Sequence, residues 1–280
     1  MRVLILGATG MAGHVIQNYL SASSKYEVVP ASRSGSSHSF EASDLPSVER
    51  LLRATRPDFV VNCVGVLVQA ANTDPALAVN VNSLLPHALV RYGREFGFRL
   101  IHISTDCVFS GQHGPYVESD PTDAWDYYGK SKALGEVIDD KNVTIRTSII
   151  GPEIRDDKTG LLEWFLAQNG VVQGYTRAVW SGVTTLELAK FVDQLLQKPE
   201  LTGLVHLTNG KGISKFDLLC LIQEIWSKGD VQIEPYCEKR VNKSLVSSRR
   251  DLGYVVPGYH DMLAELKEMG ISRAIKHQSK

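Results

Sequence analysis

Short apolar runs alternate with helix-like stretches through the first 150 residues of the chain. The apolar runs predict strands at residues 3–6, 26–30, 59–63, 100–104 and 143–149, and helical patterns lie between them at 11–20, 47–55, 74–96 and 128–138. A strand that returns to its sheet through a helix runs parallel to the first strand, and a parallel sheet needs helices on both faces. The chain is therefore expected to be an α/β protein with a doubly wound parallel sheet.

A glycine-rich turn joins the first predicted strand to the first predicted helix. Glycine permits a tight turn and close approach of a ligand to the backbone, and the helix start presents free N–H groups to an anion. The spacing is G-x-x-G-x-x-G, and a connection that binds nothing is the alternative. The position after an N-terminal strand favours a Rossmann-type, dinucleotide-binding sheet. The turn residues expected to contact the cofactor are Gly7, Thr9, Gly10, Met11 and Gly13.

Ser32 and Arg33 stand at the end of the second predicted strand. An acidic residue there would bind the ribose of NAD, whereas a basic residue accommodates the extra phosphate of NADP. NADP(H) is therefore favoured, and NAD(H) stays open because Arg33 could simply be a solvent-facing loop residue. Asp44 could reach the adenine edge or cap the following helix.

The pattern loosens after Gly151-Pro152. Helices are expected at 161–168, 185–196 and 216–226 and a strand at 204–207, and the tail 231–280 shows no clear periodicity. We expect residues 1–150 to form the dinucleotide-binding domain, with 183–208 returning to it. Residues 151–182 and 209–280 are expected to form a smaller, partly interleaved substrate lobe.

Tyr128 and Lys132 are four residues apart and share one face of a predicted helix. A fixed ammonium favours the phenolate form of a neighbouring tyrosine, which can then exchange a proton with a substrate oxygen. Ser104 and Thr105 end the strand at 100–104, and ligands in open parallel sheets bind beyond the strand ends. One of these hydroxyls can polarise the same oxygen, while the other caps the strand end.

These features resemble the extended short-chain dehydrogenase/reductase family, and within it the dTDP-4-dehydrorhamnose reductase-like, sugar-nucleotide-reducing branch. The resemblance covers nearly the whole chain. Its motifs are Gly7–Gly13, Arg56-Pro57-Asp58, Val61-Asn62-Cys63, Asn72–Asn82, Ser104–Gly111, Glu118-Ser119-Asp120, Tyr128–Glu136 and Arg146-Thr147-Ser148.

The resemblance implies a role for each matching position. Thr105 matches the catalytic hydroxyl, Tyr128 the proton donor, and Lys132 the residue that binds the nicotinamide ribose and tunes the tyrosine. Further cofactor-binding positions are Cys63, Val64, Gly65, Asn82, Ser104 and Thr147, although Asn82 could equally support a helix. The tentative substrate-binding residues are Cys107, Val108, Phe109, Trp164, Arg240 and Ser244.

Two positions depart from the family pattern. Position 107 is cysteine where these reductases usually carry tyrosine, which leaves the sugar open. The segment Cys237–Ser248 matches the family's R-P-x-x-S-type stretch only loosely, so Arg240 and Ser244 could instead be solvated.

The implied activity is reduction of a nucleotide-linked 4-keto-6-deoxy sugar by NADPH, in nucleotide-sugar and cell-surface polysaccharide biosynthesis. A sugar-nucleotide epimerase on the same scaffold is one alternative. A dehydratase is disfavoured because Asp106 is followed by Cys107, not by a second acid. A non-catalytic, NADP-binding regulatory subunit is the other alternative, since fold alone does not settle function.

The composition of the chain excludes several classes of binding partner. Thirty basic and thirty-one acidic side chains give a net charge of −1, which offers no field for nucleic acid. The apolar runs are far shorter than a membrane span, and Cys63, Cys107, Cys220 and Cys237 form no metal or disulfide pattern. No ligand cluster suggests a metal. We expect a cytoplasmic protein with a nucleotide-sugar substrate, and a homodimer is one option for its assembly.

Overall fold

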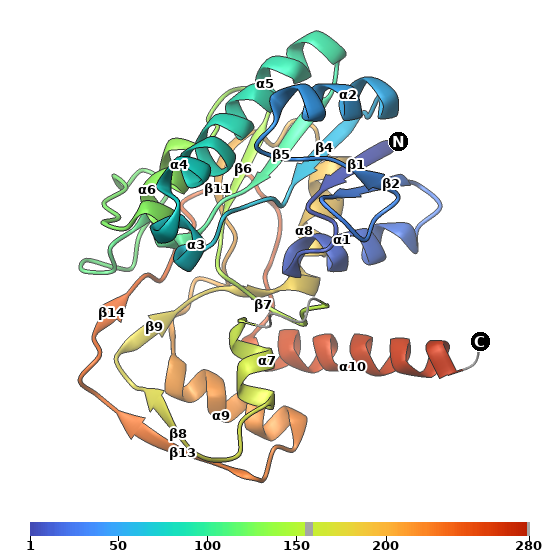
Figure 1. The fold of residues 1–280 in the computed structure, drawn as a ribbon. Helices are drawn as coiled ribbons and strands as arrows, with labels where there is room; N and C mark the ends of the chain where they lie inside the picture. The colour runs from blue at the N-terminus through green and yellow to red at the C-terminus, as the bar shows by residue number, and fades with distance from the viewer. Residues whose placement is uncertain (155–158, 279–280) are drawn as a thin grey trace.

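A seven-stranded parallel sheet forms the larger lobe of the computed structural model, which describes residues 1–154 and 159–278 (Figure 1). The strand order is β11-β6-β5-β4-β1-β2-β3. The strands are β1 (Arg2–Leu6), β2 (Glu27–Ser32), β3 (His38–Ser39), β4 (Phe59–Asn62), β5 (Arg99–Ile103), β6 (Val143–Arg146) and β11 (Gly203–His206). The order reverses between β1 and β4, so a crevice forms beyond their carboxyl ends. The predicted doubly wound α/β sheet is confirmed.

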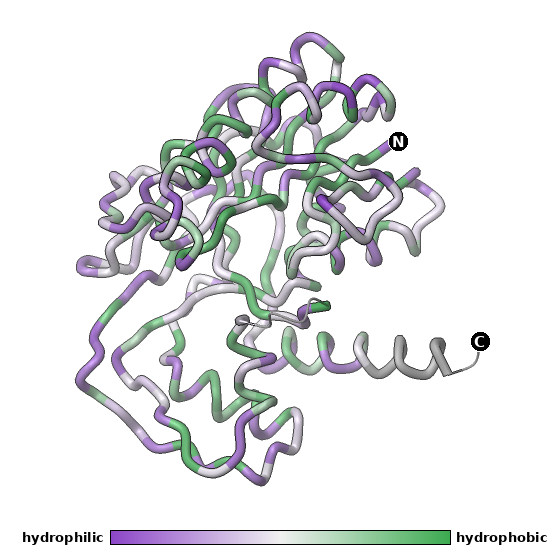
Figure 2. Tube along the Cα trace, viewed as in Figure 1, coloured by the Kyte–Doolittle hydropathy of each residue, from purple (hydrophilic) through white to green (hydrophobic). Residues whose placement is uncertain are grey.

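Helices cover both faces of this sheet. Helices α1 (Met11–Ser21) and α8 (Thr185–Gln197) pack together on one face, and α2 (Leu45–Thr55) and α5 (Leu85–Phe96) pack together on the other (Figure 1). Strand β1 supplies Val3 and Ile5 to the first core and Leu4 and Leu6 to the second. Both faces of β1 are therefore apolar, which explains the continuous apolar run at the start of the sequence, and Figure 2 shows hydrophobic residues along the central strands.

The predicted helix at 74–96 consists of three consecutive pieces: α4 (Pro75–Ala78), the π-helical stretch η1 (Val79–Leu84) and α5. The Asp74 carboxylate caps the start by accepting a hydrogen bond from the Leu77 N–H at 3.0 Å. A short helix that the sequence patterns did not predict, α3 (Val68–Thr73), precedes it. The predicted helix at 128–138 is shorter, α6 (Tyr127–Leu134), because Gly135 ends it against the backbone of η1.

The smaller lobe has three short sheets. Strands β8 (Gly170–Tyr175) and β13 (Val231–Tyr236) pair in parallel, and β9 (Ala178–Trp180) lies between β12 (Ile213–Ser214) and β14 (Val241–Asn242). Strands β7 (Ile149–Ile150) and β10 (Val183–Thr184) pair near the junction with the larger lobe. The helices of this lobe are α7 (Leu161–Leu166), α9 (Lys215–Trp226) and α10 (Tyr259–Gln278).

One prediction about the second half of the chain was incomplete. The tail 231–280 contains β13, β14 and the 20-residue helix α10, although its sequence shows no clear periodicity. The first turns of α10 bury Met262, Leu263 and Leu266 against the core of the first face, and that short apolar stripe sets the position of the helix. No helix among the described residues combines the length and apolarity needed to cross a membrane.

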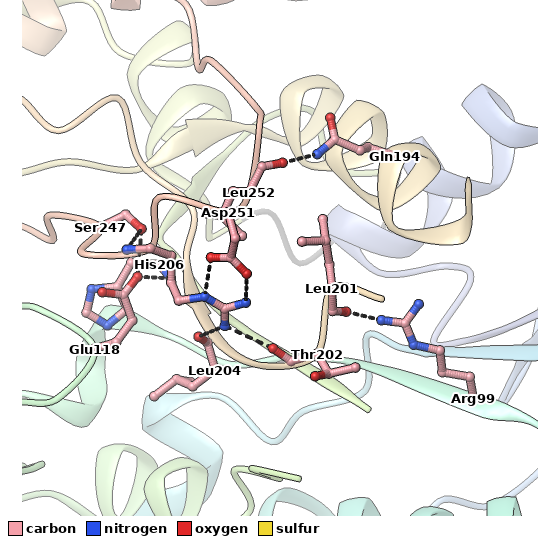
Figure 3. Close-up of polar contacts among 11 residues, drawn as sticks. Arg99, Glu118, Gln194, Leu201, Thr202, Leu204, His206, Ser247, Asp251 and Leu252 are labelled. Atoms are coloured by element: carbon pink, nitrogen blue, oxygen red, sulfur yellow. Dashed lines mark hydrogen bonds and ion pairs between the residues drawn. The ribbon is translucent and has the colours of Figure 1, made fainter. Parts of the chain in front are cut away.

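The segment after β14 returns to the larger lobe and is fastened to the sheet edge by polar contacts (Figure 3). The Glu118 carboxylate accepts hydrogen bonds from the His206 N–H at 3.0 Å, the Ser247 hydroxyl at 2.7 Å and the Ser248 N–H at 2.8 Å. Arg249 donates to Thr202 O at 2.9 Å and to Leu204 O at 3.1 Å. Burial opposes ionisation of Glu118, but these hydrogen bonds lower its pKa to about 2.

Candidate active site

The glycine-rich turn shapes one wall of the crevice. Gly7 adopts φ 82°, in the left-handed region that favours glycine, and its N–H donates to Ala31 O at 2.9 Å. A Cβ on Gly13 would lie 2.2 Å from Gly7 O, so only glycine lets α1 begin this close to the turn. No side chain caps the start of α1 at Gly10. The first N–H groups of this helix are therefore available to a phosphate.

A cavity of about 520 Å³ lies beside this turn. Its lining residues are Gly7, Thr9, Gly10, Ser32, Arg33, Ser34, Gly35, Phe40, Glu41, Ala42, Cys63, Val64, Gly65, Val66, Leu77, Val81 and Ile154. Eight of the predicted cofactor residues are in this set: Gly7, Thr9, Gly10, Ser32, Arg33, Cys63, Val64 and Gly65. The glycine contacts and the uncapped helix start fit the pyrophosphate of a dinucleotide.

Three other predicted residues of this region, Met11, Gly13 and Asp44, lie outside the cavity lining, whereas Ser32 and Arg33 are part of it. Gly13 packs on the turn itself, and a Cβ on Gly160 would meet the Met11 methyl group at 2.4 Å. Asp44 precedes α2 without a capping hydrogen bond from its side chain and lies 3.6 Å from Arg50. The Ser32 hydroxyl donates within its own loop, to Ser34 O at 2.6 Å. The exposed guanidinium of Arg33 lines this end of the crevice and provides a positive charge there for a phosphate.

Thr105 and Tyr128 come together at the carboxyl end of β5. Thr105 precedes the turn η2 (Asp106–Val108), and its hydroxyl oxygen accepts a hydrogen bond from the Cys107 N–H at 3.1 Å. The Thr105 hydroxyl donates to the Asp106 carboxylate at 3.2 Å, and Tyr128, in the first turn of α6, lies close enough to Thr105 for this hydroxyl to affect the pKa of its phenol. A Cβ on Gly129 would lie 2.2 Å from Cys107 O, so the glycine after Tyr128 allows α6 to approach the turn this closely.

The Tyr128 phenol is held in its protonated form. Burial raises its pKa, the neighbouring Cys107 and Asp106 raise it further, and the Thr105 hydroxyl lowers it only in part. Lys132 is buried in the next turn of α6, where its Nζ donates to Ile103 O at 2.7 Å and lies 3.5 Å from His102 Nε2. Burial lowers the pKa of Lys132 to about 8. The ammonium is thus anchored on β5, and the expected lowering of the tyrosine pKa is not seen in this arrangement.

In three of the expected cofactor residues, the side chain forms hydrogen bonds within the protein. Asn82 accepts from the Val66 N–H at 2.8 Å and donates to the Ser131 hydroxyl at 3.0 Å, which supports α6. The Ser104 hydroxyl donates to Glu136 at 2.7 Å, and the Thr147 hydroxyl donates to Leu207 O at 2.9 Å. Thr105, not Ser104, is therefore the hydroxyl that faces Tyr128.

The six tentative substrate residues fall into different surroundings. Cys107 lies close to Tyr128, whereas Val108, the last residue of the turn, and Phe109, which follows it, are fully buried. Trp164 lines a cavity of about 580 Å³ in the smaller lobe, and Arg240 lines another of about 910 Å³ with Trp125 and Arg177. The Ser244 hydroxyl is buried and donates to Asn242 at 2.6 Å.

Sequence patterns did not single out the lysines of the smaller lobe that face this site. Lys215 begins α9, and Lys243 follows β14. Both act electrostatically on Asp106, beside Thr105. Lys239 and Lys243 are four residues apart, and Val241 stands between them, so the sequence shows no alternating pattern of basic residues that would have drawn attention to them.

Comparison with known proteins agrees with this geometry. The chain matches the family described as RmlD substrate binding domain over residues 1–249. A dTDP-4-dehydrorhamnose reductase of Salmonella typhimurium is 29% identical over 235 residues, which cover 79% of this chain and 77% of that one.

Two solved structures share the fold. The dTDP-4-dehydrorhamnose reductase from Bacillus anthracis, in complex with NADP, has a TM-score of 0.83 at 21% identity and covers 96% of this chain and 99% of its own. The UDP-glucose 4-epimerase from Thermus thermophilus, in complex with NAD, has a TM-score of 0.73 at 23% identity, covering 94% and 97%. Since the family match spans most of the chain, the protein belongs to the RmlD substrate binding domain family and is, as the sequence predicts, an oxidoreductase of the short-chain dehydrogenase/reductase type.

Proposed function

We propose that this protein uses NADPH to reduce the C4 ketone of a 4-keto-6-deoxy sugar linked to a nucleoside diphosphate, as a step in nucleotide-sugar and cell-surface polysaccharide biosynthesis. The observation that carries the proposal is the position of the Thr105 hydroxyl next to the buried Tyr128 phenol at the carboxyl end of β5. The pair stands beside a crevice whose glycine turn and Arg33 suit a phosphorylated dinucleotide. The name of the Salmonella relative supports dTDP-4-dehydrorhamnose as the first substrate to test.

In the proposed mechanism, Tyr128 donates the proton to the ketone oxygen. The raised pKa of the phenol keeps it protonated at neutral pH, which is the form an acid needs. The bound reduced nicotinamide supplies the hydride to the ketone carbon. The Thr105 hydroxyl hydrogen-bonds the same ketone oxygen and stabilises the negative charge that develops there.

In the same mechanism, Lys132 assists the return of the Tyr128 phenolate to the protonated phenol. With a pKa of about 8, its amine exchanges protons near neutral pH, and its position one turn after Tyr128 on α6 supports a role for its charge in stabilising the phenolate that forms, although the protonated phenol shows no effect of that charge. The contact between Lys132 Nζ and Ile103 O leaves the other ammonium protons for a ribose hydroxyl. Lys132 would therefore both orient the cofactor and stabilise the phenolate.

The experiment is to follow NADPH oxidation against dTDP-, UDP- and GDP-linked 4-keto-6-deoxy sugars. The proposal expects one substrate of this panel to be reduced, with NADPH preferred over NADH. Absence of turnover with all of them, in protein that binds NADPH, would reject the reductase. An epimerase would instead interconvert a sugar nucleotide without net consumption of NADPH.

A further inference from the structure

Three lysines of the smaller lobe gather between its aromatic cavity and the catalytic turn. We call Lys215, Lys239 and Lys243 the lysine cluster. Burial raises the pKa of Asp106, and the charges of Lys243 and Lys215 oppose this rise. Burial lowers the pKa of Lys215, and the charge of Lys239 lowers it further, so the three charges act on one region. The positive potential of the cluster is thus directed at the reacting end of the site.

The extended chain around β14 sorts its side chains onto two sides. Successive residues of a strand point to opposite faces. Lys239 lies 4.8 Å from the Tyr175 ring centroid and lines the aromatic cavity, whereas Arg240 and Asn242 line the separate cavity and Val241, between them, lines both. Of the basic side chains of this segment, Lys239 thus lines the aromatic cavity, and Lys243 acts on Asp106.

Lys215 is a half-buried cation without a close anion. Its Nζ lies 5.1 Å from the Trp180 ring centroid, and among the described residues no carboxylate lies within ion-pairing distance. By contrast, Lys228 pairs with Asp230 at 2.8 Å. Burial lowers the pKa of Lys215 to about 8, Lys239 lowers it too, and the more distant Asp106 and Cys107 raise it. A buried ammonium is unfavourable unless an anion joins it, which points to a ligand.

The position of the cluster suggests which anion this is. Lys215 and Lys239 line the cavity of about 580 Å³ together with Trp164 and Tyr175, whose rings can stack on a flat base. Lys215 is also near enough to Asp106 and Cys107 to interact electrostatically with both, and these two residues act on Tyr128. A ligand with a base in the cavity and a sugar at Tyr128 has its diphosphate at the lysine cluster.

We propose that the lysine cluster binds the diphosphate of the substrate, with Lys215 as its principal contact. This inference rests on the proposed function for the identity of the ligand, and it adds the residues that hold the charged part. Ammonium groups bind phosphate oxygens by charge-assisted hydrogen bonds.

The test measures binding without turnover. Titration calorimetry with dTDP, UDP and GDP identifies the nucleotide that binds the wild-type protein, and the matching nucleoside is titrated as the uncharged probe. Lys215→Met keeps most of the side-chain volume and should weaken the nucleoside diphosphate by about tenfold or more, which is the loss of one charge-assisted contact. Binding of the nucleoside should stay within about twofold, because it uses the aromatic rings. Lys211→Met removes an exposed lysine nearby and should change neither.

A second readout is proton uptake. Titrations at about pH 8 in buffers of different ionisation enthalpy should show that the wild-type protein takes up protons as the diphosphate binds, because the anion favours the charged form of Lys215. Lys215→Met should lose most of this uptake, while Lys211→Met keeps it. NADPH affinity and the thermal melt confirm that each variant is folded.

The outcomes separate this inference from the proposed function. Equal affinity of the wild type and Lys215→Met for the nucleoside diphosphate would overturn the inference, even if the keto sugar is reduced. Equal weakening of nucleoside and nucleoside diphosphate would also overturn it, as would a wild-type protein that binds none of the three diphosphates. Lysine-dependent diphosphate binding without reduction of any keto sugar would support the inference and reject the reductase alone.

Discussion

Replacing Gly129 by alanine would test whether the approach of α6 to the catalytic turn sets the rate. The added Cβ would lie 2.2 Å from Cys107 O and 2.5 Å from the Ala124 Cβ. An ordinary contact begins at 3.4 Å, so the helix and the turn must separate by about 1 Å. Tyr128 moves with the helix and Thr105 with the turn. A displacement of about 1 Å at reacting groups can reduce turnover about 100-fold.

The assay compares the turnover of Gly129→Ala with its stability, using the sugar nucleotide that the wild type reduces. Overpacking destabilises a protein by about 1–3 kcal/mol, which leaves most of the molecules folded, so a 100-fold loss of rate would exceed the folding effect. Gly229→Ala is the matched control, because a Cβ there meets no atom within 4 Å. If folded Gly129→Ala retains turnover within about threefold of the wild type, the argument that Gly129 sets the geometry is wrong.

Three further outcomes are expected. Tyr128→Phe should reduce turnover by about 100-fold or more through loss of the proton donor, with NADPH affinity unchanged; wild-type turnover would remove this tyrosine from the mechanism. Arg33→Ala should weaken NADPH by about tenfold and leave NADH within about twofold, measured by fluorescence titration, and equal weakening of both would contradict a phosphate contact. Glu118→Gln should lower the melting temperature at pH 7. Because the folded pKa of Glu118, about 2, lies below the unfolded value of about 4.3, the difference from the wild type should shrink as pH falls from about 4 to 2; a constant difference would show that charge is not involved.

The sheet could be predicted from the sequence because its pattern is local. Strand β1 is apolar on both faces, as Val3, Leu4, Ile5 and Leu6 show, and a glycine turn or a cap marks the next helix. The sequence of the smaller lobe shows weaker periodic patterns than that of the sheet. Strands β8 and β13 pair across about 60 residues of chain, and α10 buries only a short stripe near its start. Neither feature leaves a long periodic pattern, so both depend on tertiary contacts.

In the candidate site, too, some residues could be predicted from the sequence and others could not. Turn and motif residues such as Gly7, Thr105 and Tyr128 could be found by type and spacing, because their chemistry demands those residues at those places. The choice between Ser104 and Thr105 needed the structure, since only their partners differ. Lys215 could not be found from the sequence, because its role comes from facing Asp106, which lies more than 100 residues earlier.

The interleaving of the two lobes has a consequence for synthesis on the ribosome. Helix α8 covers the same sheet face as α1, and β11 pairs with the free edge of β6, yet α8 ends only at residue 197 and β11 at residue 206 of 280. Until then, the nascent chain presents an apolar sheet face and an open strand edge, which are surfaces that promote aggregation. The early part of this chain should therefore depend on chaperones during translation until the last edge strand emerges.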